Sequence, residues 1–186
     1  MKILVIDNYD SFVYNLIYII KEQADHQVDV IRNDQLTIQD INQYDKILLS
    51  PGPGIPHEAG QLMEVIHTYA KSKDILGICL GHQALGQYMG MQLKQLAEPF
   101  HGISSKINIV EHDILFDGVS NHTPIAHYHS WVVDTPPDEI IVTAYDDEGN
   151  VMAYKHRELN IRGLQFHPES ILTVEGKKMI TNWLNN

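Results

Sequence analysis

Short apolar runs alternate with helix-like segments along the first half of the chain. Runs with the length and composition of buried strands occupy residues 2–6, 28–31, 46–49 and 75–78. Segments predicted as helices lie between or directly after them, at residues 11–20, with Ser11 as the cap, and at 37–41, 59–70 and 80–89. Strands that alternate with helices favour a parallel sheet covered on both faces.

The second half of the chain has shorter apolar runs and more turn residues. Strands are predicted at residues 106–110, 124–128, 140–144, 151–154 and 163–166, and a final helix at 173–184. No repeat, low-complexity segment or linker separates the two halves. The chain has 186 residues, of which 44% are hydrophobic and 20% charged, so a single globular domain is expected over residues 1–186.

Charge and cysteine content exclude several classes of partner and site. Lys and Arg number 13 against 24 Asp and Glu, and the net charge of −11 repels phosphate backbones and anionic membranes. Neither nucleic acid nor a membrane is therefore expected as a partner. The single cysteine, Cys79, rules out an internal disulfide and a cysteine-rich zinc site.

Two apolar segments bear on the location of the protein. The run at residues 3–6 ends at Asp7, which is too early for a secretory signal. The uncharged stretch at 75–93 is interrupted by glycine, histidine and glutamine, so it is too polar to span a membrane. A cytoplasmic location is expected.

Cys79 lies between two glycines at the predicted junction of a strand and a helix. Residues 77–81, Gly-Ile-Cys-Leu-Gly, have the glycine spacing of the sharp turn that exposes a nucleophile in hydrolases. The sulfur is then expected at a helix N-terminus, where backbone N–H groups and the helix dipole favour the thiolate. A lone cysteine is more often a buried structural residue, but the flanking glycines favour a nucleophile here.

A candidate base and its orienting group occur together as His167-Pro168-Glu169. Proline favours an extended backbone at the residue before it, and alternate residues of an extended chain project from one face. Glu169 is therefore expected to contact His167 and to fix its tautomer. With 11 histidines in the chain, a chance occurrence near a strand end is the alternative.

Several candidate segments each follow a predicted strand. They are residues 7–11, 51–54, Cys79 and His167. In open α/β sheets the ligand crevice lies outside the carboxyl ends of the strands, so these segments are expected to meet at one edge of the sheet.

Residues 51–54, Pro-Gly-Pro-Gly, are either a plain turn or part of this site. The backbone N–H of Gly52 or Gly54, with that of Leu80, is a candidate oxyanion hole beside the thiol. The segment is not a phosphate-binding loop, because the chain lacks the required Gly-Lys-Ser/Thr pattern and the third glycine of a dinucleotide fingerprint.

His127 and His129 are expected on one face of a strand and are a possible metal pair. No acidic or cysteine ligand accompanies them at a suitable spacing, so no metal site is predicted. Trp131 is expected to pack rather than to bind a cofactor.

Several sequence blocks together resemble the class I glutamine amidotransferase family. The blocks are residues 7–12 (DNYDSF), 49–54 (LSPGPG), 77–83 (GICLGHQ), 128–130 (YHS) and 165–170 (QFHPES), in the order of that family. The resemblance extends over essentially the whole chain. It implies a three-layer α/β fold, in which a mostly parallel central sheet has helices on both faces and a small antiparallel extension.

The resemblance also implies a role for each block. It makes Cys79 the nucleophile, His167 the general base and acid, and Glu169 the residue that orients His167. The residues implied to line a pocket for L-glutamine are Gly52, Pro53, Gly54, Leu80, Gln83, Ser130 and Trp131. No cofactor and no metal is implied.

The activity implied by the resemblance is hydrolysis of L-glutamine to glutamate and ammonia. The ammonia is then expected to pass to a chorismate-binding synthase subunit, which makes anthranilate; the alternatives are a subunit that makes aminodeoxychorismate or one glutaminase shared by both syntheses. Two other classes remain as rivals: a stand-alone cysteine hydrolase and a catalytically silent binding module. The chain departs from the pattern at Val13, Ile103 and His127, where threonine, lysine and arginine are usual, and these departures are expected to affect partner contacts rather than the chemistry.

Overall fold

The computed structural model describes residues 1–23 and 26–186. Its β-strands are β1 (Lys2–Asp7), β2 (Gln27–Arg32), β3 (Lys46–Leu49), β4 (Asp74–Ile78), β5 (Gln92–Lys106), β6 (Asn108–Ile109), β7 (Pro124–Asp134), β8 (Ile140–Tyr145), β9 (Val151–His156) and β10 (Ile161–Leu164). The α-helices are α1 (Val13–Glu22), α2 (Leu62–Tyr69), α3 (Leu80–Tyr88) and α4 (Gly176–Leu184). Short 3₁₀ helices occupy η1 (Ile38–Gln43), η2 (Pro56–Glu58) and η3 (Ile114–Phe116).

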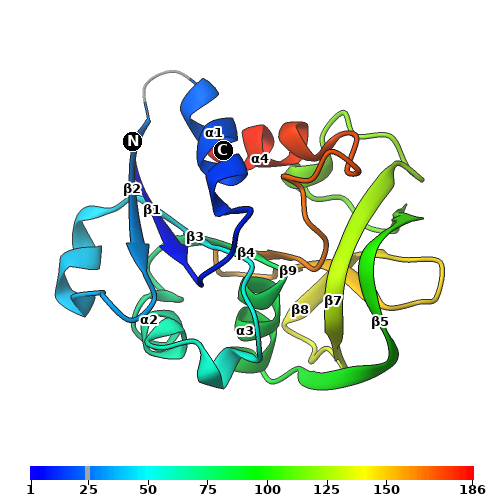
Figure 1. Ribbon diagram of the computed structural model, residues 1–186, viewed down its shortest axis with the longest axis horizontal. Coiled ribbons are helices and arrows are strands. Elements are labelled where there is room, and N and C mark those ends of the chain that lie inside the picture. Colours follow the sequence, from blue (N-terminus) through cyan, green and yellow to red (C-terminus); the bar gives the residue numbers. More distant parts are fainter. Residues whose placement is uncertain (24–25) are drawn as a thin grey trace.

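An eight-stranded central sheet has the order β2-β1-β3-β4-β10-β9-β8-β6. The first five strands in this order run parallel, and β9, β8 and β6 extend the sheet in antiparallel fashion. Helices α1 and α4 cover one face and α2 and α3 the other (Figure 1). The predicted fold class is therefore confirmed, including the antiparallel extension.

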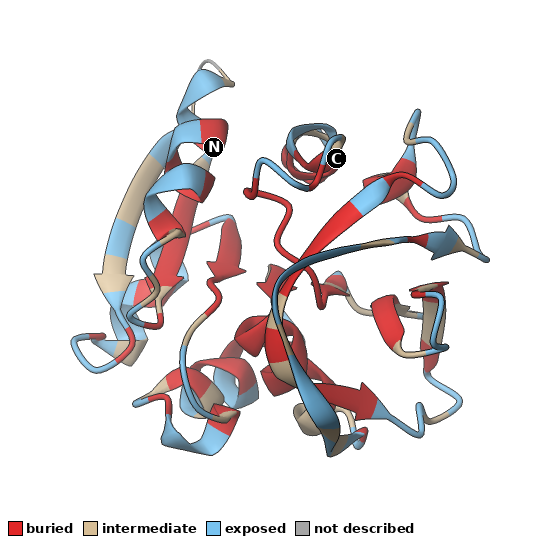
Figure 2. Ribbon diagram, turned by 45° about the vertical axis from the view of Figure 1, so that its right-hand side comes forward, coloured by how far each residue is buried: buried red, intermediate tan, exposed pale blue. Residues whose placement is uncertain are grey.

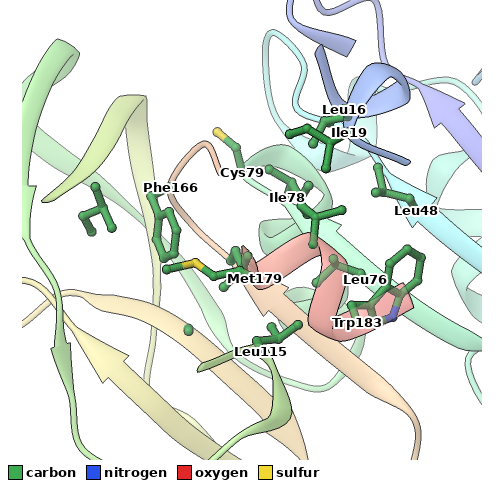
Figure 3. Close-up of a cluster of buried hydrophobic side chains, with 14 of the residues drawn as sticks. Leu16, Ile19, Leu48, Leu76, Ile78, Cys79, Leu115, Phe166, Met179 and Trp183 are labelled. Carbon is green, nitrogen blue, oxygen red and sulfur yellow. The ribbon is translucent and has the colours of Figure 1, made fainter. Parts of the chain in front are cut away.

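The core has two parts because alternate residues of a strand project to opposite faces of the sheet. On β1, Ile3 and Val5 pack with α1 and α4, whereas Leu4 and Ile6 pack with α2 and α3. Figure 3 shows the first part, with α4 side chains beside those of β4 and Cys79 at the border of the cluster. The nucleophile candidate is thus attached to the buried core of the protein.

A separate two-stranded ribbon, β5 with β7, lies beside the central sheet. No strand is predicted from the sequence between residues 92 and 105, and β7 extends beyond the predicted 124–128. The register of the ribbon shifts between Gln95 and Phe100 and again between His101 and Ile103, so the alternation typical of a strand is lost. Figure 2 shows β5 as mostly exposed, which further weakens its apolar pattern.

Several predicted boundaries are wrong for local reasons. Ser11 makes no capping hydrogen bond to α1; instead Asp10 Oδ1 accepts one from the backbone N–H of Phe12 at 2.7 Å. The predicted strand 106–110 is interrupted, because Lys106 ends β5 and β6 begins at Asn108. The predicted helix at 37–41 is the 3₁₀ helix η1, and α2 begins later than predicted because Gly60, at φ +52°, turns the chain first.

The final helix begins at Gly176 rather than at residue 173. Residues before it form turns, in which the Thr173 hydroxyl donates to the His167 carbonyl at 2.6 Å and accepts from the Ala126 backbone N–H at 3.0 Å. These hydrogen bonds connect Thr173 to β7 and to His167, and the helix begins only after this turn. Among the described residues, no helix has both the length and the apolarity needed to cross a membrane.

Candidate active site

Cys79 occupies the turn between β4 and α3 in a strained backbone conformation. Its φ and ψ are 50° and −100°, a region that non-glycine residues rarely adopt. The Cys79 N–H donates to the Leu164 carbonyl of β10 at 2.8 Å. A Cβ at Gly77 would lie 2.5 Å from the backbone of Gly81, so this turn requires glycine at that position. The sharp turn predicted from the sequence is present.

His167 and Glu169 form a buried pair directly after β10. Their contact, from Nδ1 to Oε1, is 2.6 Å, and the two side chains are almost completely buried. The His167 N–H donates to the Ala126 carbonyl of β7 at 3.1 Å, which fixes the backbone as well. The other ring nitrogen, Nε2, has no hydrogen-bond partner among the described residues. The imidazole is therefore held at Nδ1, and Nε2 is the nitrogen left to interact with Cys79.

The charge of the neighbouring groups decides the protonation of His167. Burial lowers its pKa, but the charge and hydrogen bonding of Cys79 and Glu169 outweigh that effect, and the pKa of His167 is raised well above its usual value. Beside an ionised Cys79, the protonated form of His167 is thus favoured.

Replacing Glu169 with glutamine is expected to lower the pKa of His167, because the variant loses one of the charges that stabilise the imidazolium. NMR titration of the histidine ring measures the change. A histidine whose pKa is higher in the folded than in the unfolded chain stabilises the fold by being protonated. This contribution is complete below the unfolded pKa of about 6.5, and it is lost as the pH rises through the folded pKa. The stability difference between wild type and Glu169→Gln should therefore shrink at alkaline pH.

The control for this titration is Glu64→Gln, which removes an exposed carboxylate from α2 on the opposite face of the sheet. It should leave the His167 titration unchanged. An unchanged titration in Glu169→Gln would show that the 2.6 Å contact does not govern the imidazole.

Two pockets meet at Cys79. The first, called the Trp131 pocket, has a volume of about 260 Å³ and is lined by Gly52, Pro53, Gly54, Cys79, Gln83, Tyr128, His129, Ser130 and Trp131. The second, called the Phe12 pocket, has a volume of about 340 Å³ and is lined by Tyr9, Asp10, Ser11, Phe12, Pro51, Gly52, Pro53, Cys79, His101, Tyr128 and His167. The segments expected to meet at the sheet edge are therefore brought together.

The residues expected around glutamine line the Trp131 pocket, with one exception. Leu80 is not part of the lining; its side chain lies under Gly52, where a Cβ would be 2.8 Å from Leu80 Cδ2. The same Cβ would lie 2.6 Å from the Asn8 backbone oxygen. Gly52 is thus required for the close packing of the 51–54 loop against the start of α3.

Aromatic rings cover His167 on the side of the Phe12 pocket. Ring centroids of Tyr128 and Phe12 lie 5.1 Å and 6.2 Å from that of His167, and His101 lies 5.8 Å from Tyr128. Asp10 lines the same pocket, and burial raises the pKa of its carboxyl. His101 was not predicted from the sequence, because β5 itself was not.

His127 and His129 contact each other, 3.0 Å apart, on one face of β7 as expected. Their outer nitrogens contact Ser105 Oγ at 2.7 Å and the Trp131 carbonyl at 3.0 Å. Burial lowers the pKa of His127 to about 4 and that of His129 to about 3, so both are neutral near pH 7. Val13 and His127, two of the positions expected to affect partner contacts, are buried, and only Ile103 is at the surface.

Comparison with known proteins identifies the family. The family model described as glutamine amidotransferase class-I matches residues 4–186. The aminodeoxychorismate/anthranilate synthase component 2 of Bacillus subtilis is 43% identical over 188 residues, which cover 98% of this chain and 95% of that protein. The chain thus belongs to the class I glutamine amidotransferases.

Other relatives show how far the likeness extends. The bifunctional protein TrpGD of Thermotoga maritima is 42% identical over 99% of this chain, which spans only 32% of that longer protein. The solved structure of a GMP synthase protein from Thermoplasma acidophilum, 23% identical, matches all of this chain and 92% of its own with a TM-score of 0.89. At that identity the structural match supports the fold alone.

Proposed function

We propose that residues 1–186 act as a single glutaminase domain that hydrolyses L-glutamine and supplies ammonia to a chorismate-using synthase subunit. The observation that carries this proposal is the position of Cys79, at the meeting point of two pockets and beside the His167–Glu169 pair. Membership of the glutamine amidotransferases supplies the substrate class.

In the first step, the Cys79 thiolate attacks the side-chain amide carbon of glutamine bound in the Trp131 pocket. Backbone N–H groups of Leu80 and of Gly52 or Gly54 stabilise the oxyanion. The carbon–nitrogen bond then breaks, and protonated His167 donates its proton to the leaving nitrogen, which departs as ammonia. A γ-glutamyl thioester remains on Cys79.

In the second step, the neutral His167 takes a proton from water, and the resulting hydroxide attacks the thioester carbon. The carbon–sulfur bond breaks, glutamate leaves, and the proton on His167 restores the starting state. Glu169 keeps the ring in one orientation throughout. Each proton is carried by His167 or water, so the scheme requires no cofactor.

We propose that the partner synthase makes anthranilate, with aminodeoxychorismate as the alternative product. The name of the Bacillus subtilis relative includes both products, so family membership supports both. We propose the cytoplasm as the location of this protein. A protected route between the two proteins keeps the ammonia unprotonated and therefore nucleophilic.

Reconstitution with candidate synthase subunits tests this function. Purified chain, synthase, chorismate and glutamine should yield an aromatic amine whose identity, anthranilate or aminodeoxychorismate, names the partner. The synthase supplied with an ammonium salt at alkaline pH should form the same product without this chain. No glutamine-dependent product with either synthase would contradict the proposal.

The rival classes give different results in the same experiment. A stand-alone cysteine hydrolase would release ammonia at its full rate without a synthase. A silent binding module would alter the ammonium-dependent rate of its partner but release no ammonia from glutamine.

A further inference from the structure

Gln165 is completely buried and contacts the reacting sulfur. It follows the last residue of β10, and its Nε2 lies 3.8 Å from Cys79 Sγ, a long contact of the kind that the large sulfur atom makes with an N–H donor. Its Oε1 lies 3.2 Å from Gln83 Nε2. The side-chain amide of Gln165 thus bridges the nucleophile and a residue that lines the Trp131 pocket.

The orientation of both amides follows from a backbone carbonyl. Gln83 contacts the Trp131 oxygen at 2.9 Å, and a carbonyl oxygen only accepts, so the Gln83 atom at this contact is the NH₂ group. His129 Nδ1 donates to the same oxygen. The second hydrogen of Gln83 Nε2 then goes to the Gln165 oxygen, which directs the Gln165 N–H group at the sulfur.

We propose that Gln165 is a positioning residue that donates a hydrogen bond to the Cys79 thiolate, with its orientation fixed through Gln83 by the Trp131 carbonyl. A donor to an anion makes a shorter and stronger hydrogen bond than a donor to a neutral thiol, so Gln165 favours the ionised sulfur. The contact also restrains the side-chain torsion of Cys79 on its strained backbone.

The hydrogen-bonded side-chain amides of Gln165 and Gln83 connect Cys79 to the Trp131 pocket. Both hydrogens of Gln83 Nε2 are used within the protein, so its Oε1 is the atom left to accept from a bound molecule. A substrate ammonium bound there would polarise the amide chain towards the sulfur. This step rests on the proposed function, because it takes L-glutamine as the ligand.

The pH dependence of Cys79 alkylation by iodoacetamide tests the proposal without any substrate. Cys79 is the only cysteine of the chain, so the modification reports one site. Gln165→Met removes the donor with little change in size, and Gln165→Glu places a carboxylate oxygen against the sulfur. At a pH below the alkylation midpoint, the rate should fall about tenfold in Gln165→Met and further in Gln165→Glu.

The matched control is Gln87→Met, which alters a partly buried glutamine of α3 whose Oε1 has no hydrogen-bond partner among the described residues. It should leave the alkylation profile unchanged. All variants keep the titratable groups that line the two pockets, which are Tyr9, Asp10, Cys79, His101, Tyr128, His129 and His167. A shift in Gln165→Met that is absent from Gln87→Met is therefore due to loss of the amide.

A second measurement uses the wild-type chain and does not depend on the folding of a variant. The side-chain amide protons of Gln165 should shift in the NMR spectrum as Cys79 ionises or is alkylated. Static amide signals, or alkylation profiles identical to wild type in folded Gln165 variants, would overturn the proposal.

Turnover separates this proposal from the proposed function. The glutaminase kcat should fall in Gln165→Met by a larger factor than KM rises, since Gln165 contacts the sulfur, whereas Gln83, which lines the pocket, keeps its hydrogen bond to the Trp131 oxygen. If the Gln165 variants show the expected alkylation shift but wild type has no glutaminase activity even with a synthase, the proposed function is wrong and the role of Gln165 stands.

Discussion

Replacing Cys79 with alanine should reduce glutamine-dependent ammonia release by on the order of 10⁴-fold or more, because removal of a nucleophile eliminates the covalent route altogether. The remaining pocket residues are unaffected, so the variant should still bind glutamine. Ammonia release measures the first effect and isothermal titration calorimetry the second.

The Cys79→Ala substitution also removes the interaction of Cys79 with His167. The pKa of His167 should therefore fall towards the usual range, which an NMR titration of the ring would detect. Undiminished ammonia release by a folded Cys79→Ala variant would refute the assignment of the nucleophile. Loss of glutamine binding would instead indicate that the substitution had disturbed the Trp131 pocket.

Replacing Gly81 with alanine should destabilise the protein by more than about 3 kcal/mol and disorder the Cys79 turn. The new Cβ would lie 2.5 Å from the Leu49 backbone oxygen and 2.6 Å from Leu49 Cβ, both in a completely buried strand that has no room to move. Urea unfolding measures the loss, and slower alkylation of Cys79 in the folded fraction would report the damaged turn.

Gly86→Ala is the matched control on the same helix. Its Cβ would lie 2.9 Å from Cγ1 and 3.4 Å from Cβ of the buried Val133, so that side chain must shift, although no backbone atom is in the way. Alanine also gains about 1 kcal/mol of helix propensity over glycine, which offsets the crowding. The free energy of unfolding should change by less than about 1 kcal/mol. Equal destabilisation by Gly81→Ala and Gly86→Ala would show that contact with Leu49 is not the cause.

The sequence by itself predicts the candidate residues of the site and determines the parallel half of the sheet. Runs such as residues 2–6 and 46–49 are buried on both faces, so their strand character is continuous and easily recognised. The Cys79 turn is also predicted from neighbouring residues, because glycines on both sides of one cysteine favour a sharp turn. The His167–Glu169 contact follows from two residues separated by a proline.

The tertiary structure alone decides what surrounds these residues. Strand β5 is hidden in the sequence by its bulges, yet its pairing with β7 forms the ribbon that holds Ser130 and Trp131 at the pocket. Gln165 and Cys79 lie 86 positions apart, and only the pairing of β10 with β4 brings them together. Local patterns determine which side chains can react, whereas contacts between distant segments depend on strand order and register, which no short stretch of sequence encodes.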